Sequence, residues 1–415
     1  MILVTVLLLI VGIVMTVLTR FVQVRKLGAS VRMVGDSLRH PTDGVSPFQA
    51  VCTALAATVG TGNIAGVAGA IALGGPGAVF WMWMSAFFGM ATKYAEVVLA
   101  LRYRRKDKQG NWLGGPMYYI REGMGSKTLA AVFAFFAILA SLGMGNMAQV
   151  NTIASAAVDA VPGIHPLFIG VAAAVPVALV TVGGAKRIGA VMERLVPLVA
   201  AIYILGSVAV LVVHWQKLGI AFSQILEGAF APRAIWGGSM GLAIRWGVTR
   251  GVFSNEAGLG SAPIAHAAAE AAPEEQGLMG IFEVFLDTVV LCTLTALTIL
   301  VSGVEIPYGE TVGAPLATAA LETVFGTWAA GLMAICLALL ALATLMSWQL
   351  YGAGCARYLF GAKGEKAYRL VYLLAIVMGA AMELDLVWTF SDLCNGLMAL
   401  PNLAAMLVLR KEIKE

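Results

Sequence analysis

Two long apolar stretches of this chain are each interrupted by a short glycine-containing segment, and these interruptions restrict the fold more than any other feature. Residues 47–73 are long enough to cross a lipid bilayer, yet residues 60–63 (Gly-Thr-Gly-Asn) are poor helix formers. Residues 258–261 (Gly-Leu-Gly-Ser) repeat that form inside the apolar stretch 236–271. Unwound backbone at membrane depth persists only where it is buried in protein or lines a polar cavity. Two interrupted spans in corresponding halves therefore predict a transport site near the middle of the membrane.

The composition indicates the kind of chain in which these stretches lie. Hydrophobic residues make up 60% of the sequence and charged residues 12%, which excludes an ordinary soluble domain and indicates a polytopic helical membrane protein. The five cysteines form no CxxC pair and the four histidines form no cluster, so we expect no transition-metal site. The sequence also shows no HExxH motif and no nucleophile–base pair, which argues against an intramembrane enzyme.

Charged residues and Gly/Pro breaks divide the chain into eleven apolar spans, so we expect an all-α membrane protein. Two further segments, 27–40 and 216–232, have the pattern of interfacial helices, and 311–325 is expected to form a short helix on the outer side. The predicted membrane-spanning helices cover residues 1–19, 47–73, 77–101, 129–160, 164–183, 190–213, 236–271, 278–302, 327–356, 366–384 and 387–409.

The interrupted helices are the second and seventh of this series, so one leading helix precedes ten others that divide into five and five. An odd number of spans in each half inverts the second half relative to the first. Most of the 27 lysine and arginine residues fall in loops that are cytoplasmic if the N-terminus is outside and the C-terminus inside. We therefore expect one plasma-membrane transporter domain over residues 1–415, with an extra N-terminal helix and interfacial segment at 1–40 and repeats at 47–214 and 236–410.

The first interruption carries groups that suit a zwitterion together with a cation. A broken helix exposes carbonyl groups at the end of its first half and N–H groups at the start of its second half. The carbonyls of Ala56 to Val59 would face a cation. The N–H groups of Thr61 to Asn63 would face an anion, and the Asn63 side-chain oxygen is a further cation ligand. A close glycine-mediated contact between two helices would explain the same residues.

The second interruption adds an acidic residue. Glu256 lies in the middle of a span, where a charge is costly and therefore indicates function. Glu256 either binds a substrate ammonium group or a cation, or pairs with Arg250 or Arg245. The oxygens of Ser254 and Asn255 suit a substrate amine or sodium.

Two other spans carry pairs of residues that share a helix face. Asn146 and Gln149 are three positions apart, and Thr344 and Trp348 are four apart. Such residues hold membrane helices together as often as they bind ligands.

Charged residues also lie within spans. Asp287 interrupts an apolar stretch, and a gating or proton-carrying role is open for Asp287, Glu256 and Arg250. Lys93 and Glu96 are three residues apart, so we expect them to form a structural ion pair.

Three long motifs resemble those of one family. They are residues 74–89, which begin Gly-Gly-Pro-Gly-Ala-Val-Phe-Trp-Met-Trp-Met, residues 58–66 (Thr-Val-Gly-Thr-Gly-Asn-Ile-Ala-Gly) and residues 253–263 (Phe-Ser-Asn-Glu-Ala-Gly-Leu-Gly-Ser-Ala-Pro). On these motifs the chain resembles the alanine/glycine:cation symporters, or sodium:alanine symporters, along essentially its whole length. The resemblance implies a leucine-transporter-like fold of five plus five inverted helices with an extra N-terminal helix. It also implies sodium-coupled, occasionally proton-coupled, uptake of alanine or glycine.

The wider fold implies ligand positions. Asn63 and Ser254 would hold one sodium ion beside the substrate carboxylate. A second ion would lie between the carbonyls of Ala56 and Val59 and two positions of which only Thr344 carries a hydroxyl here. Because one hydroxyl is missing, we expect one ion per transport cycle.

These arguments give one set of substrate-binding residues and one set of sodium-binding residues. Trp348 is expected to cap the substrate pocket. The expected substrate-binding residues are Thr61, Gly62, Asn63, Asn146, Gln149, Phe253, Ser254, Asn255, Gly258, Thr344 and Trp348. The expected sodium-binding residues are Ala56, Thr58, Val59, Asn63, Ser254 and Thr344.

The function predicted from the sequence is a sodium-coupled symporter that imports a small neutral amino acid, alanine or glycine, by alternating access. A proton-coupled symporter, or a member specific for serine or glutamine, is the alternative. A channel would need a continuous polar lining, whereas the polar groups gather at the two interruptions. The expected partners are the amino acid, sodium and the lipid bilayer, with no cofactor besides the coupling ion, no nucleic acid and no obligate protein partner.

Overall fold

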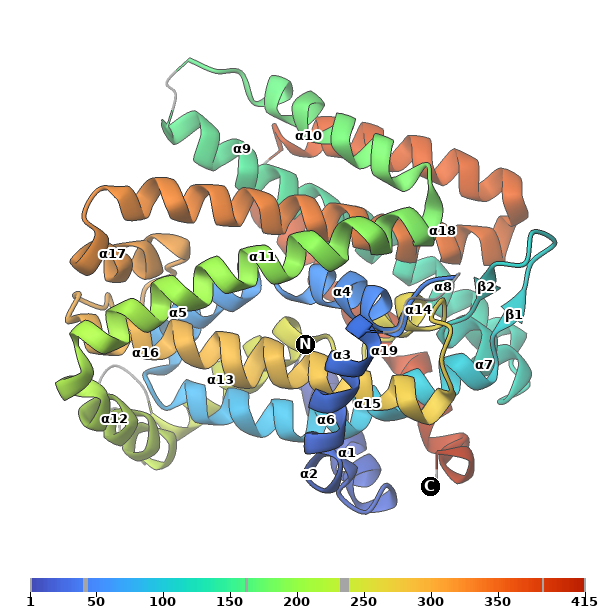
Figure 1. The fold of residues 1–415 in the computed structure, drawn as a ribbon, viewed down its shortest axis with the longest axis horizontal. Coiled ribbons are helices and arrows are strands. Elements are labelled where there is room, and N and C mark those ends of the chain that lie inside the picture. The colour runs from blue at the N-terminus through green and yellow to red at the C-terminus, as the bar shows by residue number, and fades with distance from the viewer. Residues whose placement is uncertain (1, 40–43, 161–162, 232–238, 383, 414–415) are drawn as a thin grey trace.

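The computed structural model describes residues 2–39, 44–160, 163–231, 239–382 and 384–413. The described chain is almost entirely helical, and its long helices run roughly across the view of Figure 1. The elements of the first half are α1 (Ile2–Leu18), α2 (Val22–Arg25), α3 (Leu27–Arg39), α4 (Pro47–Thr58), η1 (Gly62–Gly66), α5 (Val67–Gly74), α6 (Ala78–Arg102), β1 (Arg105–Lys106), β2 (Trp112–Leu113), α7 (Pro116–Glu122), α8 (Lys127–Leu142), η2 (Gly143–Met147), α9 (Ala148–Ala160), α10 (Pro166–Thr181) and α11 (Gly184–Val213).

The second half follows the same pattern of long helices and short connecting pieces (Figure 1). Its elements are η3 (Trp215–Lys217), α12 (Leu218–Phe230), α13 (Met240–Asn255), α14 (Ala262–His266), α15 (Pro273–Val284), η4 (Phe285–Cys292), α16 (Thr293–Ser302), α17 (Ala314–Phe325), α18 (Trp328–Gly379), α19 (Leu384–Val408) and η5 (Arg410–Glu412). The antiparallel pair β1–β2 is a short hairpin between α6 and α7.

The first interrupted span has the break that the sequence predicts. α4 begins with a capping box in which the Ser46 hydroxyl accepts a hydrogen bond of 3.0 Å from the Gln49 N–H. The helix ends at Thr58, because Val59 adopts an extended conformation. The following helical segment, Gly62–Gly74, is bent by 52° relative to α4.

The second interrupted span is broken by backbone that only glycine adopts readily. α13 ends at Asn255, and the following residue, Glu256, has a left-handed φ of 52°. Gly258 and Gly260 then have φ values of 91° and 85°, and α14 resumes the helix at Ala262. The predicted start of this span at residue 236 lies outside the described residues.

The two predicted spans 327–356 and 366–384 form α18, which is interrupted at Gly361 (φ 70°, ψ −166°). The two parts of α18 contact each other, because the Tyr372 hydroxyl donates a hydrogen bond of 2.8 Å to the Leu345 carbonyl. Figure 1 shows the later part returning beside α10.

Six helices of the described chain are long and apolar enough to cross a membrane, and the bent pair α4 with Gly62–Gly74 makes a seventh span. Shorter apolar helices lie at Leu3–Leu18, Pro166–Thr181 and Ala314–Phe325. The protein is therefore a multi-pass membrane protein. The count of eleven spans, the repeat boundaries and the orientation of the termini stay predictions.

α4 lies at the centre of the core. Leu55 and Ala56 belong to one cluster of buried apolar side chains, whereas Ala54 and Ala57 belong to the other. The break at the end of α4 is therefore enclosed on all sides by protein, which is the condition for irregular backbone in a membrane.

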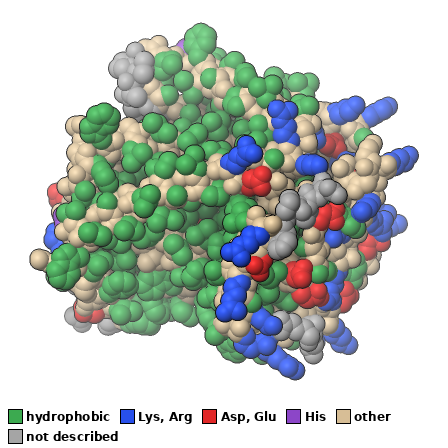
Figure 2. Space-filling model, in the orientation of Figure 1, with side chains coloured by type: hydrophobic (Ala, Val, Ile, Leu, Met, Phe, Trp, Pro, Cys, Tyr) green, Lys and Arg blue, Asp and Glu red, His purple; other side chains and the backbone are tan. Residues whose placement is uncertain are grey.

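The charged side chains are distributed unevenly over the surface. On the face shown in Figure 2, most lysine and arginine side chains gather at the end of the molecule that carries β1 and β2, while the rest is largely hydrophobic. We call this the basic end.

Candidate functional site

Asn63 is the centre of the polar contacts at the first interruption. Its Oδ1 accepts a hydrogen bond of 2.9 Å from the Gly60 N–H, which stabilises the turn between α4 and η1. Its Nδ2 donates to Asp287 Oδ1 at 2.7 Å and lies 3.1 Å from both Ser254 Oγ and the Asp287 carbonyl oxygen. Asn63 thus joins the two interrupted helices to η4.

Asp287 completes this cluster, which we call the Asn63–Asp287 cluster. Ser254 Oγ donates to Asp287 Oδ2 at 2.7 Å, and Thr288 Oγ1 donates to the same oxygen at 2.8 Å. Asp287 is fully buried, and no lysine or arginine of the described residues forms an ion pair with it. Both Asn63 and Asp287 lie in π-helical segments, which are frequent at functional sites.

The cluster offers the oxygen ligands that a hard cation prefers. Asp287 supplies its carboxylate and its carbonyl oxygen, and Ser254 supplies a hydroxyl. The Asn63 Nδ2 donor occupies the space between these oxygens. Rotation of the Asn63 amide by half a turn would place its Oδ1 there instead, but it would also break the hydrogen bond that Oδ1 accepts from the Gly60 N–H.

Thr344 reaches the first interruption from α18. Its Oγ1 donates to the Ala56 carbonyl at 2.8 Å and lies 3.0 Å from the Leu340 carbonyl. The structure therefore brings together Thr344 and Ala56, as the resemblance implies for a second ion. Thr58 makes a weaker contact of 3.3 Å, from its hydroxyl to the Ala54 carbonyl of its own helix.

Asn146 and Gln149 contact other parts of the molecule. Asn146 Nδ2 donates to the Tyr372 carbonyl at 2.8 Å, which links η2 to the later part of α18. Gln149 Nε2, at the start of α9, donates to the Met144 carbonyl of η2 at 3.2 Å. Their roles in substrate binding stay predictions.

Three further residues that are expected to bind substrate, Trp348, Phe253 and Gly258, form no hydrogen bond with Asn63 in the described part of the chain. Trp348 is fully buried against Gly145, where an added Cβ atom would lie only 2.3 Å from the indole ring. Phe253 borders a small gap that α1 and α19 also line. The Gly258 carbonyl accepts a hydrogen bond of 3.0 Å from Asn402.

Asn255 and Thr61 remain close to the two breaks. Asn255 Nδ2 donates to Thr288 Oγ1 at 3.2 Å, and its Oδ1 accepts from the Ala257 N–H at 3.1 Å. Thr61 is buried at the turn that Asn63 stabilises.

Glu256 forms no ion pair with an arginine in the part of the chain that the structure describes. Its Oε2 accepts a hydrogen bond of 2.5 Å from Ser261. Arg250 and Arg245 instead lie near the Trp246 ring, at 5.7 and 5.4 Å from its centre.

The predicted pair between Lys93 and Glu96 is wrong. Lys93 Nζ lies 3.1 Å from Glu283 Oε1 on the facing helix α15. His266 Nε2 lies 2.9 Å from the other oxygen of Glu283. The sequence did carry a signal for this contact, since Glu283 is an acidic residue within a predicted span.

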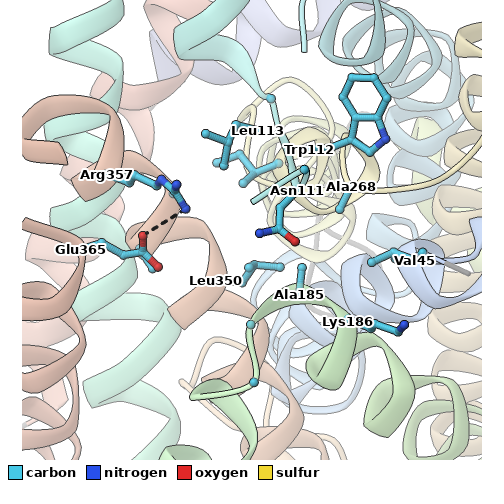
Figure 3. Close-up of a pocket in the computed structure, with 18 of the residues that line it drawn as sticks. Val45, Asn111, Trp112, Leu113, Ala185, Lys186, Ala268, Leu350, Arg357 and Glu365 are labelled. Atoms are coloured by element: carbon cyan, nitrogen blue, oxygen red, sulfur yellow. Dashed lines mark ion pairs between the residues drawn. The ribbon is translucent and has the colours of Figure 1, made fainter. Parts of the chain in front are cut away.

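A cavity of about 500 Å³ lies at the basic end (Figure 3). Ile264 of α14 and Leu350 of α18 line it, so the later half of the second interrupted helix forms part of its wall. By contrast, the cavity that borders Asn63 has a volume of about 10 Å³, enough for one water molecule.

Charged groups bridge the wall of the large cavity. Arg357 Nη2 lies 2.9 Å from Asp107 Oδ2, in the turn between β1 and β2, and Arg357 also points toward Glu365 (Figure 3). Burial opposes ionisation of Asp107, but hydrogen bonds from Asn111 and Gln109 and the Arg357 charge outweigh it. The pKa of Asp107 is therefore held below its ordinary value.

Comparison with known proteins assigns the chain to a family and a fold. The family model of the sodium:alanine symporters matches residues 1–415. The sodium/alanine symporter AgcS of Methanococcus maripaludis is 44% identical over 407 residues, which cover 96% of this chain and 89% of that protein. The probable sodium/glutamine symporter GlnT of Bacillus subtilis is 39% identical over 416 residues, covering 98% and 85% of the two chains. The crystal structure of MhsT in complex with L-phenylalanine has a TM-score of 0.63 at 15% identity and covers 89% of this chain and 90% of that one.

The fold is leucine-transporter-like, and the relatives are symporters, so the protein is a multi-pass membrane transporter and not an enzyme. Within that class, the chain belongs to the sodium:alanine symporter family.

Proposed function

We propose that this protein is a sodium-coupled symporter that imports a small neutral amino acid, alanine or glycine, by alternating access. The observation that carries the proposal is the Asn63–Asp287 cluster. It places a buried carboxylate and hydroxyl oxygens at the point where both interrupted helices meet η4. A buried carboxylate without an ion pair among the described residues is strongly stabilised by a bound cation.

Sodium binds between Asp287 and Ser254, and the Asn63 amide rotates so that its oxygen faces the ion. This rotation requires the Gly60 N–H to give up its hydrogen bond to that oxygen, so the turn at the first interruption must adjust when the ion binds. The substrate carboxylate lies beside the ion at the first interruption, where the N–H groups that begin the segment after Gly60 favour an anion. An ion and a carboxylate that share this position each strengthen the binding of the other, which couples the two fluxes.

The room for substrate lies between the two interruptions and is small. A Cβ atom added at Gly62 would lie 3.9 Å from Ser254 Cα, so a single methyl group fills much of this gap. A small gap favours alanine and glycine over glutamine, although the relative GlnT is described as a probable sodium/glutamine symporter.

The basic end faces the cytoplasm, in keeping with the positive-inside rule. The cavity beside α14 is then the route by which substrate leaves, once the later half of the second interrupted helix moves away from α18.

Uptake of labelled alanine into proteoliposomes tests this proposal. Concentrative uptake that requires an inward sodium gradient, and that unlabelled glycine competes more strongly than serine or glutamine, is the expected result. Uptake that follows a pH gradient without sodium would identify the proton as the coupling ion. Stronger competition by glutamine than by glycine would identify glutamine as the substrate.

A further inference from the structure

A second buried polar cluster lies apart from the Asn63–Asp287 cluster. It contains the contact between Lys93 and Glu283, both of whose side chains are fully buried. Because His266 contacts the second oxygen of Glu283, both oxygens of that carboxylate have polar partners. Lys93 therefore has its direct counter-charge in Glu283.

Two carboxyl groups of this region, Glu96 and Glu256, form no ion pair among the described residues, and each keeps one buried oxygen without a hydrogen-bond partner there. Of these two, Glu96 shares α6 with Lys93. It lies one turn from Lys93 on α6 and is fully buried. Its Oε1 accepts a hydrogen bond from Asn402 Nδ2, and the Gly258 N–H also faces the carboxyl group. Its Oε2 has no hydrogen-bond partner among the residues that the structure describes.

The Asn402 amide is fully engaged and cannot turn to a second role. Its Nδ2 also donates to the Gly258 carbonyl at 3.0 Å, and its Oδ1 accepts from the buried Tyr119 hydroxyl. Asn402 thus connects Glu96 on α6 to α7 and to the second interruption.

Acidic groups outnumber permanent positive charges in this region. A carboxylate buried without its own counter-charge is strongly unfavourable, and a bound proton removes the charge and makes the free oxygen a donor. The titratable or charged groups that face one another here are Lys93 and Glu96 from α6, Glu256 from the end of α13, His266 from α14, Glu283 from α15, Asp287 from η4, Tyr119 from α7 and Tyr351 from α18.

The cluster and the large cavity lie on two sides of the same short helices. On α7, Tyr119 contacts Asn402, whereas its neighbours Met117 and Tyr118 line the cavity. On α14, His266 belongs to the cluster, whereas Ile264 lines the cavity. Movement of α7 and α14 would therefore expose the cluster to water at the basic end.

We propose that Glu96 is a proton-binding site, which holds a proton while α7 and α14 cover it and exchanges that proton with the cavity when they move. The protein then binds a proton at a site separate from its sodium ligands, which goes beyond sodium-coupled transport of an amino acid.

Infrared difference spectroscopy of the purified protein tests the bound proton directly. The wild-type protein at neutral pH is expected to show the C=O stretching band of a protonated carboxyl group, and E96Q is expected to lose that component. The control E274Q changes a partly exposed carboxylate that pairs with Arg102, so it should leave the band unchanged. A band of equal intensity in E96Q and the wild type would overturn the proposal.

Transport supplies a second readout. E96Q has nearly the shape of the protonated acid, so it should fold. The ratio of its amino-acid uptake at acidic pH to that at alkaline pH should become about one, while the activation of uptake by sodium is unchanged. A ratio equal to that of the wild type would contradict proton exchange at Glu96, whatever the outcome for sodium. Should E96Q not fold, Asn402→Ala removes the hydrogen bond to Oε1 and should shift the C=O band. An unshifted band would contradict the assignment.

Discussion

Replacing Asp287 by asparagine should abolish most of the sodium affinity without unfolding the protein. The substitution keeps the shape of the side chain but removes the charge that Asn63, Ser254 and Thr288 surround. A unit charge about 4 Å from a cation contributes roughly 4 kcal/mol at the effective dielectric constant of a protein. Because 1.4 kcal/mol corresponds to about tenfold in affinity, sodium binding should weaken by about a thousandfold.

The stability of the ion-free protein should change little, because Asp287 has no ion pair among the described residues and its removal leaves no buried charge unpaired. Thermal melting of the purified protein at increasing sodium concentration measures both effects. The wild type should be stabilised by sodium and Asp287→Asn should not, while both melt at similar temperatures without sodium. Thr288→Val, which removes one donor and no charge, serves as the matched control and should weaken sodium binding by about tenfold at most. Normal sodium stabilisation of Asp287→Asn would refute the proposed ion site.

Three further predictions concern other contacts. Gly62→Ala should fold, because the added methyl group meets Ser254 at an ordinary distance, and it should raise the KM of alanine relative to that of glycine by about tenfold. The control Gly35→Ala, which has open space around the added methyl group, should change neither folding nor this KM ratio. A KM ratio in Gly62→Ala equal to that of the wild type would place the substrate elsewhere. Lys93→Met should cost about 3–5 kcal/mol of stability by removing the lysine partner of the buried Glu283, and Glu283→Gln in the same chain should restore much of it. Additive losses in a melting experiment would contradict the pairing. Arg357→Ala should cost at most about 1 kcal/mol at neutral pH, because the Arg357 side chain is partly exposed to solvent. Since the pKa of Asp107 is lowered, this contribution is present above the ordinary carboxyl range and is lost as the pH falls through the lowered value, so the melting temperatures of the two proteins should converge in acid.

The two breaks could be predicted from the sequence because their cause is local. Residues 60–63 and 258–261 contain glycines that weaken a helix wherever they lie, and the structure has its irregular backbone at both. The proximity of Asn63 and Ser254 is, by contrast, what the resemblance to the wider fold implies, and the structure has the two side chains 3.1 Å apart.

The partners of the charged residues could not be predicted in the same way. The spacing on α6 predicts that Lys93 pairs with Glu96, but α15 brings Glu283 to Lys93 from a distant part of the sequence. Asp287 reaches Asn63 from a π-helical segment, whose hydrogen-bond pattern departs from the 3.6-residue period on which face arguments rest. The direction of Trp348 depends on Gly145, which leaves room for its ring, and no pattern within α18 reveals that contact.

Parallel fluxes of labelled sodium and labelled alanine into the same proteoliposomes test the central claim most directly. If Asp287, Asn63 and Ser254 bind an ion beside the substrate, each solute should accelerate the uptake of the other, and both effects should disappear together in Asp287→Asn. Alanine uptake that is indifferent to sodium, or a sodium flux that is indifferent to alanine, would contradict the coupling.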